Sequence, residues 1–318
     1  MIIAVSGAAG YIGGWLLPEL ASRGHAVHGQ DSSKPDGPVT WDTFRVFDLA
    51  SPERRRWLHD VKPDVVIHLA ALYGRVWGEE DLVKTTAMNA GLTAEIARDA
   101  AAYGARLVYV SSSEVYGRAA ASEVVYADAE PLPLNMYGLS KKWGEEAARA
   151  YAPDGLVIAR LNMPYGPSFS PPLKGTVPST SGRPGAVGYN VLHSMIWQAS
   201  HGFGITVHEG TSRCMTWVGD AIRGLAMITE TGYPSVLNVC RDDDHRSVAS
   251  IAQLVVSITG SSSEITVIPA PHQITLHKHL DATPLRDLGW APSVSLEEGV
   301  NRCWDHFRRF DANGMWNG

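Results

Sequence analysis

The sequence contains little cysteine and no excess of basic residues. Only three cysteines occur among 318 residues, Cys214, Cys240 and Cys303. They are odd in number, far apart and without CxxC spacing, which argues against a disulfide framework, so we expect them to be reduced and buried. The 27 lysines and arginines are outnumbered by 33 acidic residues, and the formal net charge is −6. This balance argues against nucleic acid or an anionic membrane surface as a partner.

Long hydrophobic runs are also absent. No stretch reaches 18 consecutive apolar residues, and the chain begins with the strand-like MIIAVSG, without a charged leader. These features argue against a transmembrane helix and a secretory signal. With 45% hydrophobic residues the chain can bury a large core. We therefore expect a cytoplasmic globular protein that acts on a small molecule.

Short β-branched runs alternate with longer helical patterns through the first half of the chain. Apolar residues recur at three- and four-residue steps in 11–23 and 82–103, which predicts helices there. Strands joined through helices run parallel and need both faces covered, so the pattern predicts an α/β fold with a doubly wound parallel sheet. The predicted strands are MIIAVSG, HAVHGQD, FRVFDL, PDVVIHLAA, RLVYVSSS and DGLVIARLN.

The amino-acid composition of the chain changes after Gly166. Residues 167–188 are dominated by proline, serine, glycine and threonine, which predicts a long excursion without regular structure. Structured patterns resume near Tyr189, and residues 295–310 have the pattern of an amphipathic helix. No internal repeat is present.

A glycine-rich turn follows the first predicted strand and opens the first predicted helix. Its sequence is Gly7-Ala-Ala-Gly10-Tyr11-Ile12-Gly13. Glycines in this context allow a sharp turn and bring backbone amides and a helix N-terminus against a pyrophosphate. A tight turn without a ligand is the alternative interpretation.

Two acidic residues at strand ends extend this predicted nucleotide site. Asp31 ends the second strand about twenty residues on, where a carboxylate accepts hydrogen bonds from ribose hydroxyls. Because a carboxylate repels a 2′-phosphate, Asp31 favours NAD over NADP. Asp48 and Leu49, at the end of the third strand, are weaker candidates for contact with the adenine side.

Tyr137 and Lys141 are four residues apart, so on a helix they share a face. A phenol is a poor base at neutral pH, and a cation held close lowers its pKa by favouring phenolate. Such a base can take a proton from a hydroxyl while the carbon gives hydride to NAD. A surface helix pair is the alternative, because the spacing alone is a weak motif.

Successive motifs resemble those of the extended short-chain dehydrogenase/reductases, the nucleotide-sugar epimerases and dehydratases. Their order and spacing match over nearly the whole chain. The motifs are GAAGYIG, HLAA at 68–71, SSSEVYG at 111–117, YGLSK at 137–141, RLNMPYGP at 160–167, RCMTWVGDAI at 213–222 and LGWAP at 288–292.

The resemblance implies a Rossmann-type NAD-binding domain in residues 1–165, with residues of about 214–240 returning to it. Residues 166–318 would then mainly form a smaller C-terminal α/β domain that binds a nucleoside-diphosphate sugar. NAD is the implied cofactor, and Leu69, Ala70 and Ala71 of the HLAA motif join its binding residues. A homodimer is also implied.

The resemblance further implies a catalytic serine or threonine four residues before the tyrosine of the VYG motif, which selects Ser112. Its hydroxyl would contact the sugar oxygen that is oxidised, beside Tyr137. Lys141 would hold the nicotinamide ribose and lower the pKa of the tyrosine. We expect the hydroxyls of Ser111 and Ser113 to bond backbone groups, and Ser113 is also a candidate for substrate contact.

Glu114 bears on the choice of reaction. If extended geometry persists past the strand end, Ser112 and Glu114 face the same way. A carboxylate there could move the C5 proton, which becomes acidic once C4 is a ketone, or it could only line the pocket. SSEVYG resembles the TSEVYG of UDP-glucuronate decarboxylases and the TSELYG of GDP-mannose dehydratases. It departs from the Asp-Glu pair of dTDP-glucose 4,6-dehydratases, since Ser113 stands where their aspartate would be.

The resemblance also implies substrate-binding residues: Arg213 toward the phosphates, Asn162, and Tyr73 with Arg75 in the loop after HLAA. Relatives commonly carry a second phosphate-binding arginine before the DATPLRDLGW stretch, and none occurs here. His272, His277, Lys278 or His279 would replace it, or the ligand is held differently. We expect no metal site, because no third ligand accompanies the His-Lys-His run.

The lead hypothesis from the sequence is an NAD-dependent nucleotide-sugar 4-epimerase that oxidises C4 transiently and returns the hydride. A dehydratase or a UDP-glucuronate decarboxylase-like lyase that uses Glu114 is the nearest alternative, and a ketoreductase is a third. A non-catalytic NAD-binding regulator on the same fold is an alternative of another class.

Overall fold

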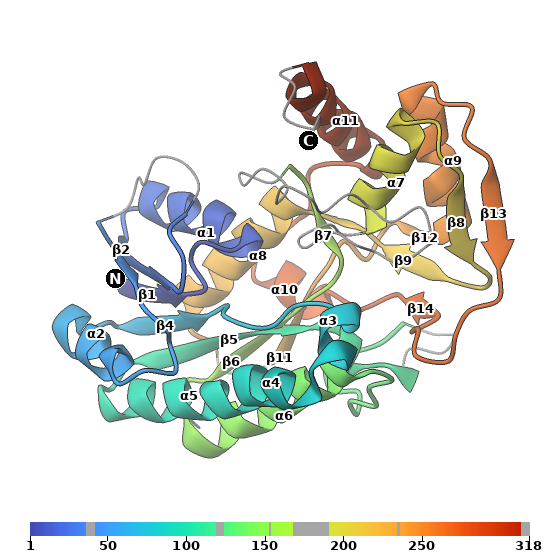
Figure 1. Ribbon diagram of the computed structural model, residues 1–318. Helices are drawn as coiled ribbons and strands as arrows, with labels where there is room; N and C mark the ends of the chain where they lie inside the picture. Colours follow the sequence, from blue (N-terminus) through green and yellow to red (C-terminus); the bar gives the residue numbers. More distant parts are fainter. Residues whose placement is uncertain (36–41, 119–123, 153, 168–190, 234–235, 313–318) are drawn as a thin grey trace.

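The computed structural model describes residues 1–35, 42–118, 124–152, 154–167, 191–233 and 236–312. Its centre is a seven-stranded sheet in the order β11-β6-β5-β4-β1-β2-β3, in which every neighbouring pair is parallel. Helices cover both faces of this sheet (Figure 1). The strands are β1 (Ile2–Ser6), β2 (Ala26–Asp31), β3 (Thr43–Val46), β4 (Val65–His68), β5 (Arg106–Ser112), β6 (Val157–Leu161) and β11 (Val236–Val239).

The central strands are buried along nearly their whole length, as expected for strands covered on both faces. Every residue of β4 and β6 is buried, and β1 is exposed only at its first residue. The predicted doubly wound parallel sheet is therefore confirmed. All six predicted strands are present, although β3 begins earlier and ends sooner than the FRVFDL run, at Thr43 and Val46.

Two layers of helices cover the sheet. Helices α1 (Tyr11–Ser22) and α8 (Val218–Thr231) pack together on one face, and α5 (Leu92–Ala102) and α6 (Met136–Tyr151) pack together on the other. Figure 1 places α2 (Glu53–Val61) on the α5 side, together with α4 (Leu82–Thr86). The short helix α3 (Arg75–Glu80) lies against α6.

The single helix predicted over 82–103 contains an irregular turn. A π-helical turn at Ala87–Gly91 separates α4 from α5. Asn89, inside this turn, is buried and hydrogen-bonds the backbone nitrogen and oxygen of Leu72 at 2.7 and 2.9 Å, and Ser140 Oγ at 3.0 Å. The turn thus satisfies a buried amide and fixes the loop that follows β4, as π-helical turns often do near functional sites.

The C-terminal part of the chain packs beside the sheet and contains two small sheets of its own. In one, β8 (Ile205–His208) pairs with β13 (Ile265–Ile268); in the other, β9 (Ser212–Cys214) lies between β12 (His245–Ser247) and β14 (His277–Lys278). Two-residue strands β7 (Pro164–Tyr165) and β10 (Thr216–Trp217) connect this part to the main sheet. Its helices are α7 (Val191–Ser200), α9 (Val248–Thr259), α10 (Thr283–Asp287) and α11 (Leu296–Ala312).

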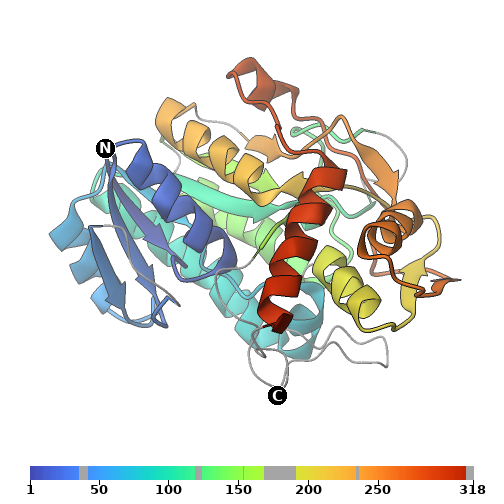
Figure 2. The same ribbon diagram turned by 90° about the horizontal axis from the view of Figure 1, so that it is seen from above.

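Helix α11 confirms the amphipathic helix predicted at 295–310. It packs against α7 and α9, as Figure 2 shows from above. The excursion predicted over 167–188 lies outside the described residues, apart from Pro167. The three cysteines are buried and form no disulfide with one another. Within the described ranges, no helix combines the length and apolar character needed to cross a membrane.

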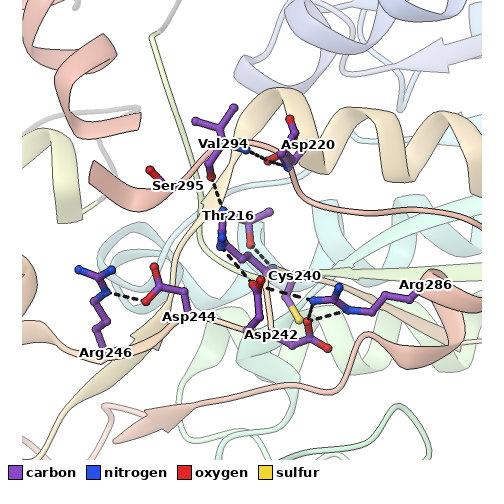
Figure 3. Close-up of polar contacts among 12 residues, drawn as sticks. Thr216, Asp220, Cys240, Asp242, Asp244, Arg246, Arg286, Val294 and Ser295 are labelled. Carbon is purple, nitrogen blue, oxygen red and sulfur yellow. Dashed lines mark hydrogen bonds and ion pairs between the residues drawn. The ribbon is translucent and has the colours of Figure 1, made fainter. Parts of the chain in front are cut away.

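A polar network anchors the segment that follows β14 (Figure 3). Asp242, just after β11, accepts hydrogen bonds from the backbone nitrogen of Ala282 at 3.1 Å and from Arg286. Asp220 of α8 accepts hydrogen bonds from the backbone nitrogens of Ser293 and Val294 at 3.0 and 3.1 Å. These contacts tie the segment that follows β14 to α8 and to the end of β11.

Candidate active site

The glycine-rich turn between β1 and α1 forms a cradle for an anionic group. Gly7 has a φ of +73°, and a Cβ there would lie 2.6 Å from the backbone nitrogen of Ala70. A Cβ at Gly13 would lie 2.5 Å from the oxygen of Ala8, so only glycine allows α1 to approach the turn. Gly10 is the N-cap of α1, whose first turn has no side-chain cap and no acidic residue. These amides and the helix dipole suit a pyrophosphate, so the residues fit NAD.

Asp31 lies against this turn at the end of β2. Its Oδ2 accepts a hydrogen bond from the backbone nitrogen of Ala9 at 3.0 Å, which places a carboxylate beside the predicted ribose position. Asp48 is exposed, and its Oδ1 accepts a hydrogen bond from the backbone nitrogen of Ala50 in its own turn at 2.9 Å. Leu49 is buried in the core. Neither contributes a described contact to the glycine turn.

The end of β4 forms the next part of the cradle. Leu69, Ala70 and Ala71 are partly buried here, and the close approach of Gly7 to Ala70 joins them to the glycine turn. His68 Nδ1 hydrogen-bonds Ser6 Oγ at 2.7 Å, while its buried Nε2 has no partner among the described residues. Burial, together with the charge of Lys141, lowers the pKa of His68 to about 3. The imidazole is therefore neutral at physiological pH.

The structure brings Ser112 and Tyr137 together. Helix α6 begins directly after its N-cap Asn135, whose Oδ1 accepts a hydrogen bond from the backbone nitrogen of Gly138 at 2.9 Å. This start buries Tyr137 in the first turn, where the Ser112 side chain hydrogen-bonds its hydroxyl. Lys141, one turn later, is buried as well, with Nζ 4.2 Å from the centroid of the Tyr109 ring.

Burial dominates the ionisation of the Tyr137 and Lys141 pair. It raises the pKa of Tyr137 above its ordinary value; the nearby Tyr73 adds to this rise, and the hydrogen bond with Ser112 opposes it. Burial also lowers the pKa of Lys141 to about 7, against the opposing charge of Glu145. Lys141 is not among the groups that shift the pKa of Tyr137, so its lowering of this pKa stays a prediction. The Lys141 ammonium packs on the Tyr109 ring. Burial disfavours both the ammonium form of Lys141 and the phenolate form of Tyr137.

The backbone conformation at Glu114 differs from the predicted extended strand. The extended geometry does not persist, because β5 ends at Ser112 and residues Ser113–Val115 form a 3-10 helix. Ser112 Oγ accepts a hydrogen bond from the backbone nitrogen of Glu114 at 3.2 Å and so caps this turn. A Cβ at Gly138 would lie 2.4 Å from the backbone carbonyl oxygen of Glu114, so a glycine in α6 permits the close approach of this turn. The Glu114 charge contributes to the raised pKa of Tyr137.

The carboxylate of Glu114 is held by donors from distant segments. Lys278 Nζ lies 2.5 Å from Oε1. Asn135 Nδ2 and Thr275 Oγ1 lie 3.2 and 3.5 Å from Oε2. From the sequence, Lys278 is expected only as a replacement for a phosphate-binding arginine. No local motif signals the pair, because 164 residues separate its members.

Ser111 of the SSSEVYG motif bonds a carboxylate rather than the predicted backbone group, whereas the backbone bond predicted for Ser113 stays a prediction. Ser111 Oγ donates to Glu145 Oε1 at 2.7 Å, and Arg160 binds the same carboxylate with two nitrogens at 2.8 and 2.7 Å. This buried network fixes α6 against β5 and β6. Ser113 is buried, and no contact of its side chain with the Ser112–Tyr137 pair is described.

The predicted substrate residues lie around this centre with different exposure. Arg213 is buried and donates to the carbonyl oxygens of Ser212 and Leu276, both at 2.7 Å. Asn162 is buried, and its Oδ1 has no hydrogen-bond partner among the described residues. Tyr73 is 59% exposed, with its ring centroid 5.6 Å from that of Tyr137. The side chain of Arg75 lies outside the described part of the chain.

Imidazoles gather on the sheet formed by β12, β9 and β14. His277 Nδ1 hydrogen-bonds Ser212 Oγ at 2.7 Å. His279 stacks on His245 with ring centroids 4.5 Å apart. Its Nε2 lies 3.1 Å from the backbone carbonyl oxygen of Asp242. No sequence motif points to His245, because only the pairing of β12 with β9 brings it here. Among the described residues, no histidine, cysteine and carboxylate group forms a metal site. His272 lies on an exposed turn.

Comparisons with known proteins agree with this geometry. Residues 3–240 match the model of the NAD dependent epimerase/dehydratase family. UDP-glucuronic acid decarboxylase 1 of Xenopus tropicalis is 27% identical over 320 residues, which cover 96% of this chain and 72% of the relative. MoeE5 in complex with UDP-glucuronic acid and NAD has a TM-score of 0.83 and 26% identity, covering 97% of this chain and 99% of that chain.

A third similar protein carries a different activity in its name. UDP-glucuronic acid 4-epimerase of Bacillus cereus, in complex with UDP-glucuronic acid and NAD, has a TM-score of 0.83 and 25% identity, covering 98% of this chain and all of that chain. The resemblance found in the sequence is thus confirmed, and the interpretation as a non-catalytic regulator is set aside. The chain belongs to the NAD-dependent epimerase/dehydratase family of enzymes, with NAD as its cofactor.

Proposed function

We propose that this protein is a nucleotide-sugar 4-epimerase: it oxidises the C4 hydroxyl of a nucleotide-linked sugar with NAD and returns the hydride to the opposite face. The observation that carries the proposal is the buried Tyr137, hydrogen-bonded to Ser112, with Lys141 one turn away on the same helix. A phenol and a hydroxyl at one point suit the deprotonation of a secondary alcohol.

Each residue has a distinct role in this reaction. Tyr137 takes the proton of the C4 hydroxyl, while the Ser112 hydroxyl bonds the same oxygen and orients it. Lys141 binds the nicotinamide ribose. When bound, NAD accepts the C4 hydride and brings a positive charge that favours the phenolate of Tyr137. After the 4-keto sugar has rotated in the site and presents its opposite face, Tyr137 returns its proton to the oxygen as the hydride returns.

The surroundings of Glu114 support epimerisation over dehydration. Elimination of water requires a base that takes the C5 proton from the 4-keto sugar. Glu114 accepts hydrogen bonds from Lys278, Asn135 and Thr275. Donors of this kind stabilise the carboxylate form, which makes it a weaker base. Glu114 therefore lines the sugar site.

Decarboxylation of a UDP-hexuronate is the second candidate. It is supported by the presence of Glu114 in the SSEVYG motif and by the names of relatives such as the Xenopus tropicalis decarboxylase. Oxidation at C4 gives a β-keto acid, which loses CO2 and leaves a carbanion at C5 that must be protonated. This route shares Ser112, Tyr137 and Lys141 with epimerisation and differs only in the steps after the ketone has formed.

We further propose a UDP-sugar as the substrate, because MoeE5 and the Bacillus cereus epimerase are complexes with UDP-glucuronic acid. Arg213 and the imidazoles of His245, His277 and His279 are the candidates to hold the diphosphate. A homodimer is part of the same proposal, and light scattering on the purified protein tests it.

Product analysis separates the candidates. The purified protein is incubated with UDP-glucose, UDP-glucuronate, UDP-N-acetylglucosamine or GDP-mannose, and products are examined by NMR and mass spectrometry. An epimerase gives a product of unchanged mass with an inverted C4. Loss of CO2 or of water would contradict the epimerase assignment and identify a decarboxylase or a dehydratase. Tyr137→Phe is the control that should remove all of these products.

A further inference from the structure

Lys278 and Glu114 form an ion pair between the two parts of the molecule. Glu114 belongs to the 3-10 helix after β5, and Lys278 belongs to β14. The Lys278 side chain is 3% exposed and the Glu114 side chain 15% exposed, so water screens the pair little. Removing one member of such a pair leaves an uncompensated charge in a buried place.

The remaining lone pairs of Glu114 also face donors. Asn135 Nδ2 and Thr275 Oγ1 approach Oε2. Asn135 cannot turn its amide oxygen toward the carboxylate without losing its cap, because Oδ1 accepts from the backbone nitrogen of Gly138 at 2.9 Å. The surroundings thus favour the ionised carboxylate over the protonated acid.

The lysine is itself held in place. Nζ lies 3.9 Å from Met163 Sδ, and Met163 has a φ of +44°. This left-handed conformation is uncommon for a residue with a side chain and persists where the surroundings enforce it. Arg213 is the cross-strand neighbour of Lys278 in the pairing of β14 with β9. Lys278 therefore contacts both Glu114 and Met163, next to Arg213 of β9.

Within the described part of the chain, ionisable groups near Glu114 come from three other elements. From α6, Tyr137 is close enough for the two groups to influence each other. From α3, Glu79 accepts a hydrogen bond from the backbone nitrogen of Met136 at 2.7 Å, next to Asn135. Lys278 from β14 contacts the carboxylate directly, and Arg213 of β9 is the cross-strand neighbour of Lys278.

We propose that Lys278 is a positioning residue that holds Glu114 ionised and hydrogen-bonded, so that this carboxylate lines the sugar site without exchanging protons with it. The inference rests on the proposed function, since it explains how a 4-keto sugar formed beside a carboxylate avoids side reactions at C5. We call the Lys278–Glu114 pair the clamp.

The side reaction that the clamp suppresses is a proton transfer without any change of oxidation state. While C4 is a ketone and the hydride rests on the cofactor, the C5–H bond is acidic. A free carboxylate at Glu114 would take this proton and leave an enolate across C4 and C5. A proton from solvent, delivered through Glu114, would then restore the C5–H bond. A carboxylate held by Lys278 is too weak a base for the first step.

The first test needs no substrate and is therefore independent of the proposed reaction. The protein is labelled with glutamate ¹³C-enriched at the side-chain carboxyl, and the Glu114 resonance is assigned by its loss in Glu114→Gln. In Lys278→Met, this resonance should titrate at a pH higher by about one unit or more than in the wild type. Lys278→Arg should titrate as the wild type does, because it keeps the charge.

Two variants control this experiment. Lys84→Met, at an exposed position on α4, should leave the Glu114 titration unchanged. Lys278→Gln keeps a donor but no charge, and it replaces Lys278→Met if that variant does not fold. Titration of Glu114 at the same pH in the wild type and in the uncharged Lys278 variant would overturn the proposal.

The second test follows the proton at C5. During turnover of a UDP-sugar in D2O, the wild type should leave C5 unlabelled, whereas Lys278→Met should introduce deuterium at C5 of the recovered sugars. Deuterium at C5 on every wild-type turnover would overturn the clamp. If no substrate is turned over, the proposed function fails while the carboxyl titration still decides the role of Lys278.

Discussion

The burial of Lys141 leads to a prediction about the stability of the folded protein. Its pKa falls from 10.5 to about 7 in the folded protein, chiefly through burial. Each tenfold change in proton affinity is worth about 1.4 kcal/mol, so the charged form destabilises the fold by up to about 5 kcal/mol. The contact of Nζ with the Tyr109 ring, worth about 0.5–2 kcal/mol, is lost when the charge is removed. We expect Lys141→Met to raise the free energy of unfolding by about 3–4.5 kcal/mol at pH 6.

The sign of the pH dependence is set by the two pKa values. Below pH 7 the lysine is protonated in both states, and the whole penalty is present. Between pH 7 and 10.5 the unfolded chain holds a proton that the folded chain has lost, so wild-type stability rises with pH. The advantage of Lys141→Met should therefore shrink as the pH rises toward 10. An advantage that stays constant or grows with pH would refute the reasoning.

Urea unfolding at pH 6, 8 and 9.5, without added cofactor, measures this difference. Because both proteins contain the same other ionisable groups, their contributions cancel in the comparison. Lys142→Met, the next residue of α6, is the control and should show a difference that does not depend on pH.

Three further predictions concern the cofactor, the reaction and the scaffold. Tyr137→Phe should lower kcat by about 10²–10⁴-fold, since the proton acceptor is removed; NAD binding measured by calorimetry should stay nearly unchanged, and a comparable loss of NAD affinity would point to a structural role instead. Gly7→Ala should abolish NAD binding, because a Cβ would lie 2.6 Å from the Ala70 nitrogen in a left-handed backbone; wild-type affinity in a titration would contradict the cradle. Glu145→Gln should destabilise the fold by about 3–5 kcal/mol, since it leaves the buried Arg160 guanidinium without its carboxylate; a urea midpoint equal to that of the wild type would show that the network is dispensable.

The sequence predicted those features of the fold that depend only on residues close together in the chain. The inner strands β1, β4, β5 and β6 are largely buried on both faces, so each appears in the sequence as a short apolar run, and the glycine turn and the start of α6 are equally local. Tyr137 is selected through its spacing from Lys141, and Ser112 through the resemblance of the SSSEVYG motif to a known family.

Features that depend on distant pairing could not be predicted. Strands β9, β12 and β14 have two or three residues each, too few to show a period. The Glu114–Lys278 pair and the stacking of His245 on His279 arise only when these strands assemble. The 3-10 helix at Ser113–Val115 departs from the alternation expected of an extended strand, because that alternation stops where β5 ends.

The pKa of Tyr137 illustrates a different limit. Sequence spacing shows that Lys141 shares a helix face with the tyrosine, but it does not show how deeply both are buried. Burial is the largest influence on the phenol and raises its pKa. The effect of one charge on another depends on solvation, which only the packed structure reveals.

The most direct test of the central claim tracks the hydrogen at C4. The protein is supplied with a UDP-sugar that it converts, carrying deuterium at C4, and the product is examined by NMR and mass spectrometry. Transient oxidation with return of the same hydride predicts a product that keeps its deuterium at C4 without net formation of NADH. Loss of the deuterium to solvent, or accumulation of reduced cofactor with each turnover, would contradict the account.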